Sequence, residues 1–147
     1  MLHLREFVEN LPKNMQIEVI GPKRVEGRVA LPASKSISNR VLVINQLAGA
    51  TNGVPRNVSD CDDTRVMLRW LADQPAVVDI GAAGTAMRFS SALLAVTPGE
   101  RIITGTERMK NRPIAVLVDA LRELGAEVEY VEKEGFPPLR IKGNSST

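Results

Sequence analysis

"LPASKSISNR", residues 31–40, places three serines, a lysine and an arginine at the expected start of a helix. Ser34 can cap that helix, and one capping residue is enough for the purpose. The free N–H groups and partial positive charge of a helix start favour an anion rather than a cation. Lys35, Ser36 and Arg40 therefore suit an anionic ligand better than they suit the helix, although a plain cap beside a solvated lysine explains the same residues.

Two further expected helix starts carry glycines or cations in a similar way. "GAAGT" (81–85) opens one helix, and Arg88 follows one turn after Gly84. "ERMKNRP" (107–113) leads into another, with Arg112 and a proline at the expected helix start. Glycine lets a ligand approach the backbone, and arginine offers bidentate hydrogen bonds to phosphate or carboxylate. Each motif alone also fits a tight turn or a solvated loop, but together the three predict a site for small molecules with several negative charges.

The rest of the chain alternates strands and helices, which predicts an α/β fold with short connections. The first expected helix carries an apolar stripe of Ile37, Val41, Ile44 and Ala48. Helices are expected over 35–47, 62–72, 86–96 and 114–124, and strands over 15–20, 27–32, 76–80, 101–105, 126–132 and 137–143. The tail "GNSST" directly follows a strand, so we expect a truncated chain.

Composition excludes several classes of function. The net charge of +2 on 147 residues is too small for a general nucleic-acid or membrane surface. Cys61 is the single cysteine and His3 the single histidine, which argues against a disulfide framework, a metal centre or a Ser–His couple. The chain has no apolar run of membrane-spanning length and no signal-peptide core, so we expect a cytoplasmic protein. Ser59 or Asp60 is the expected cap of the second helix, and capping explains the acidic run "DCDD" (60–63) better than a metal site does.

Five motifs occur in order along the chain: "LPASKSISNR", "GAAGTAMR", "ERMKNRPI", "LVDALRELGAEVEY" and "PPLRIKG". Together they resemble the 5-enolpyruvylshikimate-3-phosphate synthase (3-phosphoshikimate 1-carboxyvinyltransferase) family, from about Met15 to Gly143. The resemblance implies transfer of the enolpyruvyl group of phosphoenolpyruvate to the 5-hydroxyl of shikimate 3-phosphate, with release of phosphate and without metal or cofactor. It also implies a monomer with lobes of repeated βαβαββ units, an inverse α/β barrel-like arrangement, of which this chain would hold a truncated lobe.

The resemblance also implies roles for residues of the three helix starts. Lys35 is similar to a catalytic lysine that contacts both substrates. The expected substrate-binding residues are Lys35, Ser36 and Arg40 for shikimate 3-phosphate, and Lys35, Gly84, Thr85 and Arg112 for phosphoenolpyruvate. Arg88 matches its motif with a structural role, and no catalytic role follows for Asp62 or Asp63. The chain departs from the family pattern at Ala33, Ala82 and Phe89, where glycine, asparagine and proline are usual.

The expected domain organisation is an N-terminal extension over 1–14, a strand pair over 15–32 and an incomplete substrate-binding lobe over 33–147. We expect this chain by itself to be inactive, because the family's acid–base residues follow later in its sequence. Two alternatives remain open at this point. One is a non-catalytic anion-binding fragment, and the other is the related UDP-N-acetylglucosamine enolpyruvyl transferase, which is disfavoured because Cys61 stands at a helix start rather than in a lid loop.

Overall fold

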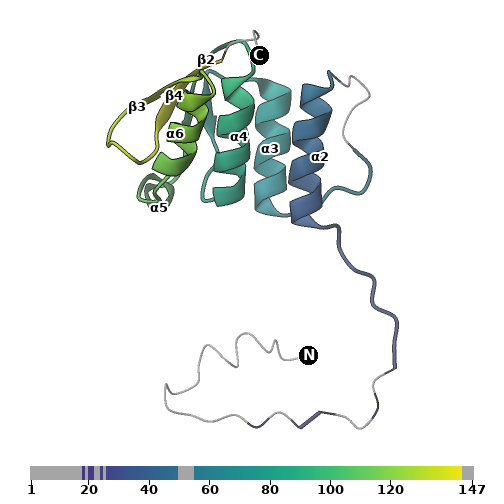
Figure 1. Cartoon of the computed structure of the whole chain (residues 1–147). Coiled ribbons are helices and arrows are strands. Elements are labelled where there is room, and N and C mark those ends of the chain that lie inside the picture. Colours follow the sequence, from purple (N-terminus) through teal and green to yellow (C-terminus); the bar gives the residue numbers. More distant parts are fainter. Residues whose placement is uncertain (1–17, 19, 22–23, 25, 50–54, 144–147) are drawn as a thin grey trace. The chain divides into compact units, whose positions relative to one another are not determined.

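The computed structural model describes residues 18, 20, 21, 24, 26–49 and 55–143 (Figure 1). The chain divides into two units between Ala30 and Leu31. In the first unit, the described residues have no regular secondary structure and most are exposed. The second unit contains every described helix and strand.

Residues 77–143 form one complete βαβαββ unit. The described strands make a four-stranded sheet in the order β1-β2-β4-β3, in which β1 and β2 are parallel and β4 is antiparallel to both neighbours. A short helix, α5, precedes the second long helix of the unit. The elements are β1 (Val77–Asp79), α4 (Gly84–Ala95), β2 (Gly99–Thr104), α5 (Glu107–Lys110), α6 (Ala115–Glu123), β3 (Glu127–Tyr130) and β4 (Leu139–Gly143).

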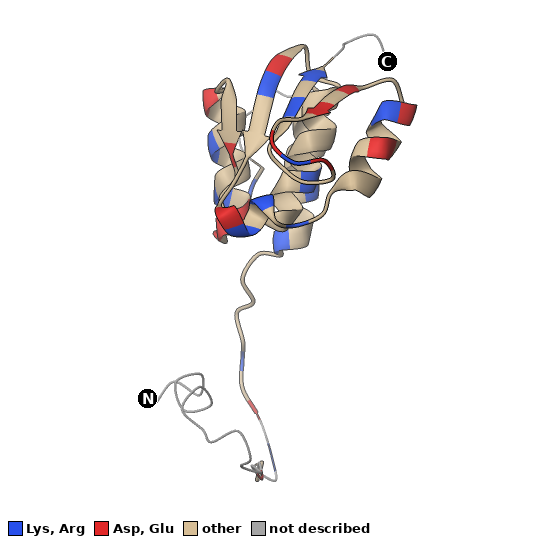
Figure 2. Cartoon of the chain, turned by 90° about the vertical axis from the view of Figure 1, so that its left-hand side faces the viewer, with Lys and Arg blue, Asp and Glu red and all other residues tan. Residues whose placement is uncertain are grey.

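Helices α4 and α6 cover one face of this sheet, and the core lies between them and the strands (Figure 1). Alternate strand residues point into that core, as the two-residue period of a strand requires. The fully buried side chains include Val78, Ile103, Leu139 and Ile141 from the strands, and Met87, Leu93, Leu94 and Val118 from the helices. Charged residues alternate along the strands (Figure 2). On the side away from this core, Lys142 pairs with Glu127 at 2.9 Å.

Two more helices, α2 (Lys35–Leu47) and α3 (Asp62–Asp73), extend the helical layer beyond α4. Each packs against the other and against α4, so the three helices lie side by side (Figure 1). Trp70 of α3 joins this layer to α4, because its indole N–H donates to Ser90 Oγ at 2.8 Å. The position of α2 and α3 therefore depends on α4.

Helix α2 forms over the predicted range but turns its apolar stripe away from the described core. Ile37 and Ile44 are 65% and 63% exposed, whereas Ser38, Asn39 and Leu42 are the buried residues. The apolar stripe therefore does not face the described core. The physical reason is that the buried face makes hydrogen bonds to the start of α3, which orient the helix more strongly than its apolar residues do.

Three other predictions need correction. Residues 27–32 are exposed and form no strand, because an isolated strand leaves its backbone groups without partners. Helix α6 begins at Ala115, after the Arg112-Pro113 pair and one residue after position 114, because Ile114 has a φ of −136°, outside the helical region. Helix α3 begins after Cys61 and receives no side-chain cap. Most of the strand expected over 15–20 lies outside the described residues.

Candidate functional site

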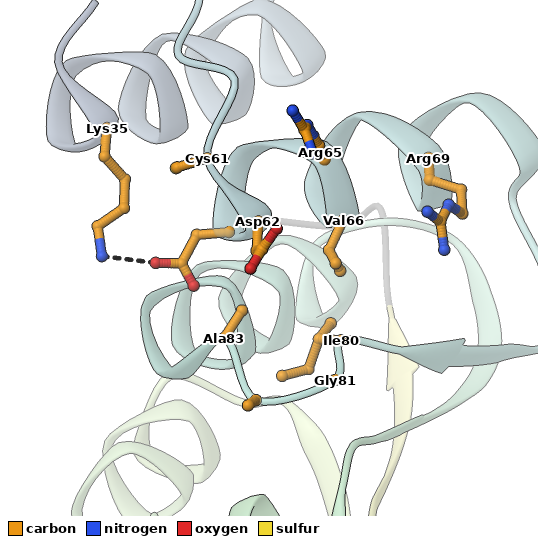
Figure 3. A pocket seen from close by; sticks show the side chains of 11 residues that line it. Lys35, Cys61, Asp62, Arg65, Val66, Arg69, Ile80, Gly81 and Ala83 are labelled. Atoms are coloured by element: carbon orange, nitrogen blue, oxygen red, sulfur yellow. Dashed lines mark ion pairs between the residues drawn. The ribbon is translucent and has the colours of Figure 1, made fainter. Parts of the chain in front are cut away.

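The starts of α2, α3 and α4 meet at one cavity of about 580 Å³ (Figure 3). The first residue of α2 lines it, as do the first turns of α3 and the loop that precedes α4. Since a helix start presents unpaired N–H groups and a partial positive charge, three such starts together favour an anion. The lining residues are Lys35, Cys61, Asp62, Asp63, Arg65, Val66, Arg69, Ile80, Gly81, Ala82 and Ala83.

Lys35 reaches across this cavity to the first turn of α3. Its Nζ lies 2.6 Å from Asp63 Oδ1, shown as the dashed line in Figure 3. The lysine side chain is 47% exposed and the aspartate 12%, so the carboxylate is the less accessible partner. The hydrogen bond to Asp63 and its negative charge raise the pKa of Lys35 above the ordinary value. Lys35 is therefore a charged donor at neutral pH.

Buried polar contacts fix the start of α2 against the start of α3. Thr64 Oγ1 donates to Asn39 Oδ1 at 2.8 Å, and both residues are fully buried. Ser38 Oγ donates to Ser34 O and accepts from the Ser59 N–H, each at 2.8 Å. The bonds from Thr64 to Asn39 and from Ser59 to Ser38 join residues more than 20 positions apart in sequence, so they fix the helix starts that carry Lys35 and Asp63.

Cys61 occupies the N-cap position of α3 and belongs to the same polar network. Its backbone N–H donates to Ser59 Oγ at 3.3 Å, and its Sγ lies 3.3 Å from Thr64 Oγ1. Burial acts to raise the pKa of the Cys61 thiol, but the hydrogen bonds from Ser59 and Thr64 outweigh it and lower the net pKa. The lowered pKa of the thiol is thus a consequence of the polar groups around it.

The start of α4 has no side-chain cap, and its first residue is packed against an arginine. A Cβ on Gly84 would lie 2.8 Å from Arg112 Cζ and would overlap the guanidinium nitrogens. A second cavity, of about 230 Å³, is lined by Gly84, Thr85, Arg88, Phe89 and Arg112. Glycine is therefore required for Arg112 to lie over the helix start. This arrangement offers backbone N–H groups and a guanidinium to the same anion.

Arg88 has a structural role in the described contacts. Its guanidinium donates to Gly84 O at 3.1 Å and to Pro113 O at 3.2 Å. The arginine thereby ties the turn that carries Arg112 to the start of α4. This geometry agrees with the structural reading of Arg88 and explains why the two segments lie close together.

Arg40 and Ser36 line neither cavity, but Arg40 lies over Phe89, which lines the second one. The Arg40 guanidinium lies 5.4 Å from the centre of the Phe89 ring and donates to Ser36 O at 2.9 Å. Ser36 is exposed, and the contact it makes here is through its backbone. Phe89, one of the departures from the family pattern, thus supports a predicted ligand residue.

The structure places four of the six predicted site residues at the two cavities, and Ser36 and Arg40 outside both linings. Lys35 lines the larger cavity, while Gly84, Thr85 and Arg112 line the smaller one. Two contacts were missed from the sequence, the Asp63 partner of Lys35 and the Phe89 support of Arg40. The only sequence signal for Asp63 was its place in a first helical turn, which capping and dipole effects already explained.

Comparisons with known proteins identify the family of the chain. A family model described as EPSP synthase (3-phosphoshikimate 1-carboxyvinyltransferase) matches residues 19–73 and 69–147. These matches cover most of the chain, and the chain belongs to the EPSP synthase family. No described helix is long and apolar enough to span a membrane.

Sequence relatives carry the same description. A Bacteroides fragilis protein named 3-phosphoshikimate 1-carboxyvinyltransferase is 56% identical over 133 residues, which are 90% of this chain and 32% of the relative. An Erwinia tasmaniensis protein of the same name is 43% identical, over 83% of this chain and 34% of the relative. The chain therefore spans about a third of the length of the curated relatives it matches.

Solved structures support the fold. Two structures of EPSP synthase from Acinetobacter baumannii match 80% of this chain and 32% of theirs, with TM-scores of 0.67 and 0.68 and sequence identities of 20% and 21%. The mixed α/β fold with its βαβαββ unit is thus the one found in EPSP synthase. The predicted fold class is confirmed.

Proposed function

We propose that this chain carries a substrate-receiving part of a 3-phosphoshikimate 1-carboxyvinyltransferase. That enzyme transfers the enolpyruvyl group of phosphoenolpyruvate to the 5-hydroxyl of shikimate 3-phosphate and releases phosphate. The observation that carries the proposal is the convergence of three helix starts on a cavity that holds Lys35, with Arg112 packed against the start of α4 beside it. Both substrates carry phosphate and carboxylate groups, which such helix starts receive.

Each predicted residue has a role in this proposal. Lys35 contacts both substrates, and its ammonium stabilises the negative charge that develops during the transfer. Gly84 and Thr85 offer backbone N–H groups to phosphoenolpyruvate, and Arg112 offers its guanidinium. Ser36 and Arg40 receive shikimate 3-phosphate. We further propose that the enzyme works as a cytoplasmic monomer without a nucleic-acid or membrane partner.

A binding experiment on this chain tests the first half of the proposal. Amide NMR spectra are recorded during titration with shikimate 3-phosphate, and shikimate without the phosphate serves as the control ligand. Saturable shifts at Ser34–Arg40 are expected for the phosphorylated ligand and much smaller ones for shikimate. Equal shifts with both ligands, or none with either, would contradict a phosphate site at this helix start.

A chimera tests the activity. The matching segment of the Bacteroides fragilis relative is replaced by this chain, and phosphate release from phosphoenolpyruvate is followed. We expect a working chimera in which Lys35→Ala lowers kcat by about 10²–10³-fold, as loss of one stabilising donor does. Lys110→Ala is the matched control, because Lys110 pairs with Glu132 at 3.0 Å and lines neither cavity. A Lys35→Ala chimera with normal turnover would refute the role of Lys35.

The same chimera separates catalysis from simple anion binding. A chimera that binds shikimate 3-phosphate normally but releases no phosphate, while the unmodified relative does so, would favour a non-catalytic anion-binding segment. Turnover that depends on Lys35 and Arg112 would exclude that alternative.

A further inference from the structure

The first turn of α3 holds two carboxylates, which differ in their exposure and in their contacts. Asp62 and Asp63 both stand in the first turn and both line the larger cavity. Asp62 is exposed, whereas the Asp63 side chain is 12% exposed and lies 2.6 Å from Lys35 Nζ. A helix-start role explains the charge of either residue but gives no reason for this difference.

We propose that Asp63 is a positioning residue for Lys35, which holds the lysine ammonium in the cavity so that it can receive a substrate anion. This inference rests on the proposed function for the identity of that anion. An ammonium has three N–H donors, and Asp63 uses one of them. The others remain for a phosphate or carboxylate group in the same cavity.

The two partners differ in their freedom to move, which decides which one positions the other. Lys35 has a long side chain whose rotamers are many when nothing holds it. Asp63 has a short side chain on the first turn of α3, and the next residue, Thr64, is fully buried and bonded to Asn39 of α2. The carboxylate is therefore fixed by the packing of two helices, and the ammonium is held by the carboxylate.

The remaining groups around the cavity leave Asp63 as the described ion-pair partner of Lys35. The other titratable or charged side chains that line it are Cys61, Asp62, Arg65 and Arg69, all from the α3 side. The loop before α4 contributes only uncharged residues, over 80–83. The raised pKa of Lys35 agrees with this pairing, because its first cause is the hydrogen bond to Asp63.

The first test measures the lysine directly and needs no ligand. Lysine labelled with ¹³C at Cε is introduced into the chain, and the Lys35 resonance, assigned by its loss in Lys35→Arg, is followed from pH 8 to pH 12. Asp63→Asn should lower the pKa of Lys35, because the ammonium loses its partner. Asp62→Asn, the matched control, should change it much less. Equal shifts in the two variants, or none in Asp63→Asn, would overturn the proposal.

The second test measures anion binding by calorimetry with shikimate 3-phosphate. Asp63→Asn should weaken binding about tenfold, as loss of a hydrogen bond to a charged group does. Asp63→Glu, which keeps the charge, should recover part of the loss. Asp62→Asn should bind as the parent chain does or slightly more tightly, since it removes a negative charge from the cavity. Tighter binding by Asp63→Asn would show that Asp63 competes with the ligand, and would overturn the positioning role.

The two tests separate failure of this inference from failure of the proposed function. If the parent chain does not bind shikimate 3-phosphate while Asp63→Asn still lowers the pKa of Lys35, the substrate assignment fails and the pairing stands. If the parent binds and Asp63→Asn changes neither quantity, the positioning role fails alone. Circular dichroism of each variant confirms folding, and Asp63→Ser, which also removes the charge, takes the place of Asp63→Asn in both tests if Asp63→Asn does not fold.

Discussion

The two helices over 35–73 and the βαβαββ unit over 77–143 are held in different ways. Seven of the residues of α4 are buried, and most of them are apolar side chains that pack on the sheet. Helix α2 buries three residues, of which Ser38 and Asn39 are polar. The unit with the sheet is thus stabilised mainly by apolar burial, while α2 is oriented by hydrogen bonds.

This difference explains where the candidate site lies. The larger cavity is lined from both regions, with Lys35 and Asp63 on one side and the loop before α4 on the other. Polar contacts can specify a position closely, because hydrogen bonds depend on distance and angle. The rigid sheet unit supplies a fixed helix start, and the polar region supplies the charged side chains that meet it.

The largest expected effect is a difference in the free energy of unfolding between a substitution in the βαβαββ unit and one in α2. Ile103→Ala, next to the last residue of β2 and fully buried, should lower the free energy of unfolding by about 2–5 kcal/mol. Ile44→Ala, on the exposed side of α2, should change it by less than about 0.5 kcal/mol. Urea denaturation of both variants measures this. Equal losses would show that the apolar side of α2 is covered in solution and would break the comparison.

The next effect concerns the fixed helix start of the sheet unit. Gly84→Ala should weaken phosphoenolpyruvate binding about tenfold in the chimera, because the new methyl group displaces the Arg112 guanidinium. Stability should stay level or rise by up to about 1 kcal/mol, since alanine is the better helix former.

The Gly84→Ala result is checked by a double-mutant cycle with Arg112→Ala. If the alanine acts through Arg112, adding it to Arg112→Ala should cost little further affinity. Additive losses in the two changes would show that Gly84 acts independently of Arg112.

A smaller effect is expected where the two regions touch through an aromatic ring. Phe89→Leu should weaken shikimate 3-phosphate binding about two- to fivefold, because Arg40 loses the ring that supports it. Phe136→Leu is the control. The Phe136 ring also lies under a cationic side chain, that of Lys133, but in a different loop. Calorimetry that gives the same change for both variants would contradict a specific role of Phe89.

The smallest effect is a loss of stability at high pH. The carboxylate partners of Lys35, Lys110 and Lys142 raise the pKa of each lysine, and burial raises the pKa of Tyr130. A raised pKa in the folded state contributes stability that is fully present below the unfolded pKa and is lost as the pH rises through the folded value. The urea midpoint should therefore fall as the pH rises above about 10.5, and Lys142→Met should reduce that fall. A midpoint that stays constant to pH 11.5 would contradict these pairings.

Much of this fold could be predicted from the residues alone. The pattern of apolar and polar residues predicted every long described helix, and it predicted the four described strands to within a few positions. Gly84 and Arg88 were singled out because glycine lets a ligand approach the backbone and arginine offers bidentate hydrogen bonds. Local sequence is sufficient for such features, since the interacting groups are neighbours in the chain.

The failures involve partners far apart in sequence. The exposed stripe of α2 could not be foreseen, because its orientation depends on bonds such as the one between Asn39 and Thr64. The pairing of Lys35 with Asp63 likewise depends on how two helix starts meet. Residues 27–32 alternate like a strand, but a strand also needs a neighbour, which one segment cannot reveal.

The row of isoleucine and leucine along the outer side of α2, formed by Ile37, Ile44 and Leu47, has a consequence for handling this chain. Each of these side chains is at least 60% exposed in the described structure. Contiguous apolar surface of this kind is uncommon on monomeric proteins and favours association. Concentrated solutions should consequently show self-association and fluorescent-dye binding that decline in Ile37→Gln/Ile44→Gln.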